Sequence, residues 1–181
     1  MEVEKTNIKD CFVIAPTVFQ DSRGYFMETF NENTFKKATG LQIRFVQDNE
    51  SQSNYGVIRG LHAQKGTMAQ AKLVRVLKGE VLDVVVDFRP DSQTYLQHYS
   101  ISLSAENKKQ LFVPRGCLHG FSVLSGDAIF FYKCDNFYDR QAEYGYRFDD
   151  PAFGIDWQIA PSKRIISEKD MQLPFFESEK K

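Results

Sequence analysis

The chain has 181 residues, with 42% hydrophobic and 26% charged side chains, a balance typical of a globular protein. This length suffices for one domain with a full core, so we expect a single domain over residues 1–181. The formal net charge is −1 and no long cluster of Lys or Arg occurs, which argues against nucleic-acid binding, while no segment approaches the ~18 apolar residues of a membrane span.

The N-terminal third is predicted to combine short strands with one helix. Its first ten residues lack the apolar run of a signal peptide, and the three cysteines of the chain are too far apart to indicate disulfides. We therefore expect a reducing, cytoplasmic location. A helix is predicted at 32–39, because Asn31 is a good N-cap and Gly40 a good stop. Strands are predicted at 11–19 with a bend at Pro16, at 25–30 after a turn at 21–24, and at 43–49.

The central stretch, residues 57–88, carries the most informative pattern. Strands are predicted at 57–64, 71–77 and 80–88, with a tight hairpin at Lys78-Gly79. Side chains alternate on a strand, so Lys72 points where Val74 and Val76 point, into an apolar space. A lysine in such a place needs a partner or a task. With His62 on a neighbouring strand, a base and a cation directed into one cavity would suit proton abstraction next to a carbonyl.

The rest of the chain continues in short strands separated by turn signals. Strands are predicted at 97–103, 110–113, 120–124 and 128–134, with a hairpin turn at 125–127 and a short helical turn at 167–170. This pattern predicts an all-β fold, a barrel or a jelly roll.

The two histidines outside the central stretch lie in different contexts. His98 shares a strand face with serines, so we expect an exposed histidine without a role. His119 ends a Pro-x-Gly-x-x-His pattern that resembles the second motif of the cupin superfamily, in which this histidine often binds a metal. The first cupin motif usually supplies His-x-His and a glutamate, but Gln64 and Lys72 stand near those places here. Two histidines and a cation make a poor divalent site, so we expect no metal, and a structural His119 bonded to the backbone remains the alternative.

Three further candidates depend on how the chain folds. Arg59 and His62 have opposite parity, so both face a cavity only if Gly60 introduces a bulge; otherwise Arg59 lies on the surface. Tyr132 lies on an apolar face and is a core tyrosine, unless its hydroxyl faces His62 across a cavity and donates a proton. The charges at 169–170 lie in a polar tail, where solvation is the default interpretation.

With these residues in view, the chain resembles the dTDP-4-dehydrorhamnose 3,5-epimerases. The resemblance runs from Phe19 to Asp170 and is carried by several stretches: DSRGYFMETFN, FVQDN, RGLHAQ, AQAKLVRVLKGEVLDVVVDFR, LSAENKKQLFVPRGCLHGF, YKC, DDPAFGIDW and ISEKD. It implies a cupin-type jelly roll with a few short helices, a homodimer, and neither a metal nor an organic cofactor. It also implies a nucleotide-linked 4-keto-6-deoxyhexose as substrate.

The resemblance assigns a role to each matching residue. His62 corresponds to the base, Asp170 to the carboxylate that orients it, Tyr132 to the acid on the opposite face of the sugar, and Lys72 to the cation at the enolate oxygen. The matching substrate-binding positions are Gln47, Asn49, Arg59, His119, Tyr138, Glu143 and Lys169, together with Arg23, Phe26 and Glu28, which would reach the nucleotide from the partner subunit.

The chain departs from the family pattern at Ala63, Glu50 and Ala71. Ala63 stands where an aromatic residue is usual, and its parity predicts that it lines the face opposite to His62. The departures leave open an epimerase that inverts only C3 or only C5 of a related sugar. Two further classes of protein compete with the epimerases: a metal-dependent cupin oxygenase and a sugar-binding cupin without chemistry.

Overall fold

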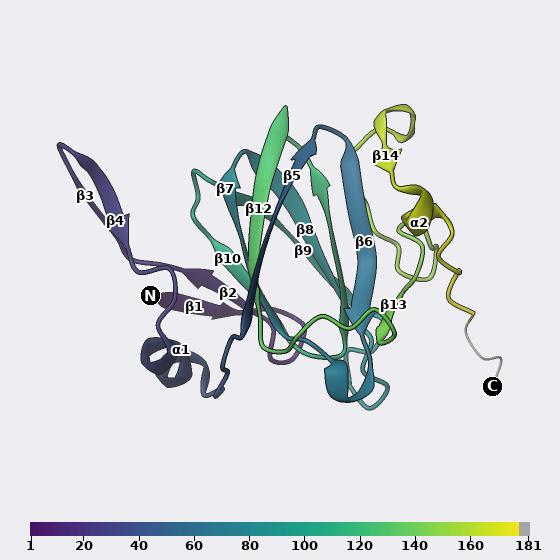
Figure 1. Cartoon of the computed structure of the whole chain (residues 1–181), viewed down its shortest axis with the longest axis horizontal. Coiled ribbons are helices and arrows are strands. Elements are labelled where there is room, and N and C mark those ends of the chain that lie inside the picture. The colour runs from purple at the N-terminus through teal and green to yellow at the C-terminus, as the bar shows by residue number, and fades with distance from the viewer. Residues whose placement is uncertain (178–181) are drawn as a thin grey trace.

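The computed structural model describes residues 1–177, and its core consists of two β-sheets that face each other (Figure 1). The first sheet has the order β1 (Glu2–Lys5), β2 (Phe12–Ala15), β10 (Gln110–Val113), β7 (Lys72–Lys78), β12 (Asp127–Cys134) and β5 (Gln47–Asn54). The second has the order β13 (Glu143–Gly145), β6 (Val57–Gln64), β11 (Cys117–Val123), β8 (Glu80–Asp87) and β9 (His98–Ser104), with β14 (Ile165–Ile166) parallel to β6. The predicted cupin-type jelly roll is confirmed.

Helical segments are short and lie at the edges of the two sheets. They are α1 (Glu32–Thr39), α2 (Glu168–Met171) and two 3₁₀ turns, Gly66–Met68 and Pro161–Lys163. The α1 prediction is confirmed at both ends, because the Asn31 side chain accepts the Thr34 N–H and Gly40 ends the helix in the left-handed conformation. None of the helices within residues 1–177 is long and apolar enough to cross a membrane.

The alternation predicted for residues 72–88 decides which side chains face the space between the sheets. Val74 and Val76 of β7 are buried there, as predicted, in one core cluster with Val81 and Val85 of β8. The other face of β8 packs outside the sandwich, against an aromatic cluster from the C-terminal third that includes Trp157. Lys72 therefore lies on the same face of β7 as the buried Val74 and Val76, and its side chain points toward the space between the sheets.

Several element boundaries differ from the prediction. The strand predicted at 43–49 begins only at Gln47, because its partner β12 accompanies it from that point and Phe45 instead packs beside α1. β11 begins at Cys117 and not at 120, since all of its residues pair with β8. The strands β1, β13 and β14 were not predicted; they are 4, 3 and 2 residues long, so each contains little periodicity.

The predicted strands 11–19 and 25–30 each prove shorter than expected. The first breaks at Pro16 into β2 and β3 (Val18–Asp21), and the second is β4 (Gly24–Met27). β3 and β4 pair only with each other and form a hairpin that stands apart from both sheets, at the opposite end of the molecule from α2 (Figure 1). Phe19 and Phe26, which are opposite each other in the hairpin, are 62% and 69% exposed.

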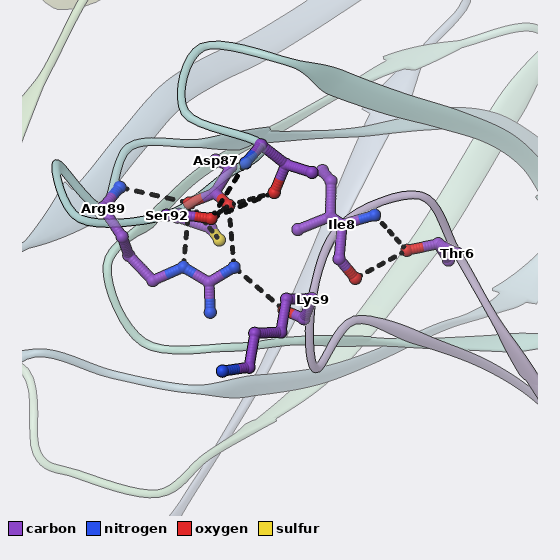
Figure 2. Close-up of polar contacts among 8 residues, drawn as sticks. Thr6, Ile8, Lys9, Asp87, Arg89 and Ser92 are labelled. Atoms are coloured by element: carbon purple, nitrogen blue, oxygen red, sulfur yellow. Dashed lines mark hydrogen bonds and ion pairs between the residues drawn. The ribbon is translucent and has the colours of Figure 1, made fainter.

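A buried carboxylate fixes the end of β8 (Figure 2). Asp87 is fully buried and accepts two hydrogen bonds of 2.8 Å from the Arg89 guanidinium, and 2.6 Å hydrogen bonds from the hydroxyls of Ser92 and Thr94. Arg89 also donates to the Lys9 carbonyl at 2.9 Å, which ties the loop after β8 to the N-terminal segment. This network fixes β8 at the end where it meets the start of β11.

Asp87→Asn is expected to lower the free energy of unfolding by about 3–5 kcal/mol, because it leaves buried donors without a charged acceptor. Burial by itself raises the pKa of Asp87, but hydrogen bonds from Arg89, Ser92 and Thr94 outweigh burial and hold that pKa well below its ordinary value. The carboxylate therefore stabilises the fold fully above the unfolded-state pKa of about 3.9, and this contribution declines as the pH falls toward the folded-state pKa.

Urea unfolding at pH 7 and in acid measures this effect. The matched control is Asp127→Asn, which removes a surface ion pair with Lys78 (2.8 Å) and should cost much less. Equal losses for the two variants at pH 7 would contradict a special role for the buried network.

Candidate active site

One cavity of about 240 Å³ opens between the two sheets, and titratable side chains from both sheets converge on it. A larger hollow lies between the N-terminal segment and residues 89–94, but its arginine is already paired with Asp87. The residues that line the smaller cavity are Gln47, Asn49, His62, Ala63, Gln64, Gln70, Lys72, Tyr132, Tyr138 and Glu143. Six of the predicted site residues besides His62 are thus in this set, so the cavity is the candidate active site.

The first element of the site is a histidine–carboxylate pair. His62 lies on β6, and its Nε2 is 2.7 Å from Oδ1 of Asp170 on α2. Asp170 is almost fully buried, and its Oδ2 accepts the Gly60 N–H at 3.4 Å. The Ser167 hydroxyl accepts the Asp170 N–H and caps α2. The prediction that 169–170 lie in a solvated tail by default is wrong for Asp170, because α2 docks against β6.

The charge state of Asp170 determines the tautomer of His62. Burial by itself raises the pKa of Asp170, but the hydrogen bond and charge of His62, with the Gly60 N–H and Lys169, outweigh it, so that the pKa is lowered. An ionised Asp170 can only accept, so His62 must donate from Nε2. The lone pair of neutral His62 is therefore on Nδ1, which leaves that nitrogen able to act as a base.

Lys72 and Tyr132 line the cavity from the sheet opposite to His62. The Lys72 amine lies 5.8 Å from the centre of the Tyr132 ring. Burial lowers the pKa of Lys72, and the negative charges of Asp83 and Glu143 act in the opposite direction. Burial also raises the pKa of Tyr132, with smaller contributions from neighbouring charges, so its hydroxyl stays protonated at neutral pH. The site thus combines a histidine on one wall with a lysine and a protonated tyrosine hydroxyl on the other.

The bulge predicted at Gly60 is present, but Arg59 is exposed and does not line the cavity, in agreement with the surface alternative. The pairing of β6 with β11 shifts between His119↔His62 and Phe121↔Arg59. Gly60 has φ +128°, and a Cβ there would lie 2.6 Å from Cα of Gly120, so both strands need glycine at this crossing. The Arg59 side chain spans the two sheets, with its Nε 3.0 Å from the Ser53 hydroxyl on β5.

His119 has a buried carboxylate as its partner. Its Nε2 lies 3.1 and 3.0 Å from the two oxygens of Asp83, which is fully buried, and its ring stacks on Phe130 with centroids 6.1 Å apart. The alternative in which the ring bonds to the backbone is therefore wrong. His119 faces the interior beside His62 and does not line the 240 Å³ cavity. Asp83 was not predicted as a site residue, although an aspartate on the inward face of a valine-rich strand was a visible signal.

Polar side chains connect across the rim of the cavity. Glu143 on β13 accepts hydrogen bonds from the Tyr138 hydroxyl (2.9 Å) and from Lys169 Nζ (2.7 Å). Gln47 accepts the Tyr138 N–H at 3.0 Å and donates to Asn49 Oδ1 at 3.0 Å. The structure thus joins five predicted substrate-binding residues in one network.

Three further predicted site residues lie in or next to the β3–β4 hairpin and do not line the cavity. Arg23 pairs with Asp21 in the β3–β4 hairpin at 2.6 Å, Phe26 is exposed there, and Glu28 accepts from Asn31 at 3.1 Å. The hairpin projects away from the sheets (Figure 1), so a single subunit does not bring these side chains to its own site.

The structure also departs from the predictions made from the sequence at four other residues, Ala63, Gln64, Gln70 and His98. Ala63 packs in the outer cluster, as its parity predicted, but it also lines the cavity, so the prediction was wrong in part. Gln64 and Gln70 were not predicted; both line the cavity and hold the 136–139 loop by hydrogen bonds to its backbone. His98 is partly buried on β9 instead of exposed, and it does not line the cavity.

A metal site would need several His, Cys, Asp or Glu side chains close together. Within residues 1–177, no three His, Cys, Asp or Glu side chains are grouped in a way that could hold a metal ion. The three cysteines, Cys11, Cys117 and Cys134, are buried free thiols. Metal independence stays a prediction.

Known proteins share this chain's sequence and fold over nearly its whole length. Residues 5–178 match the family model described as dTDP-4-dehydrorhamnose 3,5-epimerase. The dTDP-4-dehydrorhamnose 3,5-epimerase of Methanothermobacter thermautotrophicus is 49% identical over 167 residues, covering 92% of this chain and 89% of that protein. The crystal structure of the Elizabethkingia anophelis dTDP-4-dehydrorhamnose 3,5-epimerase is 55% identical with a TM-score of 0.94, covering 97% and 96% of the two chains.

A second similar structure contains a ligand. It is the dTDP-6-deoxy-D-glucose-3,5-epimerase of Legionella pneumophila in complex with dTDP-4-keto-L-rhamnose, 39% identical with a TM-score of 0.90, covering 98% of this chain and 99% of that one. The family-model match and these identities leave one assignment: the chain belongs to the dTDP-4-dehydrorhamnose 3,5-epimerase family, whose members are isomerases.

Proposed function

We propose that this protein inverts C3 and C5 of dTDP-4-keto-6-deoxy-D-glucose to give dTDP-4-keto-L-rhamnose, without a metal or an organic cofactor. The observation that carries the proposal is the convergence of the His62–Asp170 pair, Lys72 and Tyr132 on one cavity. The ligand named for the Legionella pneumophila structure supports the substrate class.

The chemistry begins with the acidity that a C4 ketone gives to the hydrogens at C3 and C5. His62 removes either proton with Nδ1, while Asp170 holds the other ring nitrogen and stabilises the imidazolium that forms. The electrons of the broken C–H bond move to the C4 oxygen, which becomes an enolate. Lys72 provides a fixed positive charge for that oxygen, a contribution typically worth about 3–4 kcal/mol of the barrier.

Inversion requires the new proton to arrive from the opposite face of the sugar. His62 comes from the second sheet and Tyr132 from the first, so they approach a bound sugar from opposite walls. The raised pKa of Tyr132 keeps its proton in place until the enolate carbon, which is strongly basic, takes it. The rim network around Glu143 and Tyr138 would bind the nucleotide, with Arg59 and His119 close to the sugar and phosphates.

A homodimer completes the proposed nucleotide site. The β3–β4 hairpin leaves Phe19 and Phe26 exposed, and an isolated two-stranded hairpin is marginally stable in water. Exposed apolar residues on such an arm indicate a surface that another chain covers. In the proposed dimer, the hairpin of each subunit reaches the cavity of its partner and brings Arg23, Phe26 and Glu28 to the nucleotide.

Phe26→Ala is expected to weaken dTDP binding by about tenfold or more, since an aromatic stacked on a base typically contributes about 1–3 kcal/mol. The fold should be intact, because Phe26 is exposed within the chain. Calorimetric titration with dTDP measures the effect, and Tyr55→Ala, at an exposed aromatic in the β5–β6 turn, is the control. A monomer that binds dTDP with full affinity would refute the shared site.

The direct test of the function is solvent exchange. Purified protein is given dTDP-4-keto-6-deoxy-D-glucose in deuterated buffer, and proton NMR follows C3 and C5. Labelling and inversion at both carbons are expected. Labelling at one carbon only would establish the single-centre alternative, and no exchange at all would leave a sugar-binding protein without chemistry.

A further inference from the structure

The helix that carries Asp170 cannot hold its own position. α2 spans only Glu168–Met171, one turn, and helices this short are unstable alone because nucleation is costly. The distance between Asp170 and His62 therefore depends on the contacts that attach α2 to the rest of the protein. The Ser167 cap acts within the helix, whereas β14, directly before it, pairs with β6 and attaches the N-terminal side of α2.

One arginine attaches the end of α2. The Nη1 of Arg147 donates to the carbonyl of Met171, the last residue of the helix, at 2.8 Å. The Nε and Nη2 of the same guanidinium donate to the two carboxylate oxygens of Asp149, each at 2.8 Å, which fixes the plane of the group. A positive charge at a helix C-terminus is also favourable for the helix dipole. Arg147 is largely buried, with 17% of its side chain exposed.

The segment after α2 strengthens this attachment. It runs back along residues 147–150, where the Arg147 N–H donates to the Pro174 carbonyl at 3.0 Å and the Phe176 N–H donates to the buried carboxylate of Asp150. The Phe176 ring packs against Tyr146 at 5.6 Å between ring centroids, and it also contacts Phe88 and Phe153. The whole segment is thus held on the stretch that contains Arg147.

The same stretch is bonded to the strand that carries His62. Tyr146 exchanges two backbone hydrogen bonds of 3.1 Å with Leu61, the residue before His62. Arg147 follows Tyr146 directly, so its guanidinium projects from a backbone that is registered to the histidine. One short piece of chain therefore holds both members of the pair, the histidine through β6 and the aspartate through α2.

We propose that Arg147 is a positioning residue that sets the hydrogen bond between Asp170 and His62, with Asp149 orienting its guanidinium. The proposal rests on the proposed function in which this pair acts as the base. Catalysis is sensitive to such positioning, since a displacement of about 1 Å can cost on the order of 100-fold in rate.

The test compares Arg147→Met, which keeps the aliphatic stem, with Arg147→Lys, which keeps the charge and loses the planar fork. The kcat of Arg147→Met should fall about 10- to 100-fold. Arg147→Lys should be only partly active, because one ammonium cannot hold both Asp149 and the Met171 carbonyl in the same geometry. Lys78→Met is the control: it removes a cation paired with Asp127 in the β7–β8 hairpin, away from α2, and should leave kcat unchanged.

A spectroscopic signature separates positioning from general destabilisation. The proton on His62 Nε2 should give a downfield NMR signal in the wild type, assigned by its absence in Asp170→Asn. In Arg147→Met this signal should broaden or move upfield while thermal unfolding stays cooperative. If Arg147→Met does not fold, Phe176→Ala loosens the same attachment from its far end and should change the signal in the same direction.

Two outcomes would overturn the inference. A folded Arg147→Met protein with wild-type kcat and an unchanged downfield signal would show that α2 is positioned without the guanidinium. If Arg147→Met has a lower kcat but an unchanged downfield signal, Arg147 affects the rate by another route than the Asp170–His62 hydrogen bond. Failure of the proposed function looks different: the wild type would then show no exchange at C3 or C5, whereas the NMR signal would still report whether Arg147 holds the pair.

Discussion

His62→Ala is expected to lower the rate of epimerisation by about 10²- to 10⁴-fold, the range typical for removal of a general base. Among the cavity-lining residues that the structure describes, no other group is arranged to replace it. The carboxylate of Glu143 is already occupied by Tyr138 and Lys169, and Lys72 approaches the cavity from the opposite sheet. The variant should lose solvent exchange at C3 and C5 together with inversion, because both begin with the same proton abstraction.

His98→Ala is the matched control for this prediction. His98 lies on β9 and does not line the cavity, so the exchange rate and the inversion rate should both stay at the wild-type level. Proton NMR in deuterated buffer measures both rates in one experiment. Substantial exchange by His62→Ala would mean that the base is another residue.

Tyr132→Phe is expected to separate the two proton transfers. The change keeps the ring that packs beside Phe130 and removes only the hydroxyl, so the fold should be unaffected. The enolate can still form, because His62, Asp170 and Lys72 remain. It would then be reprotonated mainly by His62, on the face from which the proton left. The variant should therefore incorporate deuterium into the sugar while inversion falls by about 10²-fold or more.

The ratio of labelling to inversion is the quantity that tests Tyr132. In the wild type, each labelled carbon should be an inverted one. In Tyr132→Phe, label should accumulate in unchanged substrate. Inversion of both centres at an undiminished rate by Tyr132→Phe would show that Tyr132 is only a packing residue.

Local patterns in the sequence determined the strands and the faces of the central stretch. The alternation at Lys72, Val74 and Val76 predicted that the lysine shares an apolar space with the two valines, because side chains on a strand alternate with period two whatever the strand pairs with. The caps of α1 were predicted for the same reason, since Asn31 and Gly40 act within one turn of the helix ends. The bulge beside His62 was predicted from Gly60, but its close approach to Gly120 on another strand could not be read from the sequence.

The roles of the site residues were predicted from the family resemblance. Their proximity in space is a consequence of the tertiary structure. Asp170 stands 108 residues after His62 and in a polar tail, so no periodicity connects the two. They lie together because β14 pairs with β6 and the segment after α2 packs on residues 147–150. His119 and Asp83 likewise meet only because β11 pairs with β8. Alternation and capping act over a few residues and can be read along the chain. Contacts between distant residues depend on which surfaces bury each other, and this is decided only when the whole chain packs.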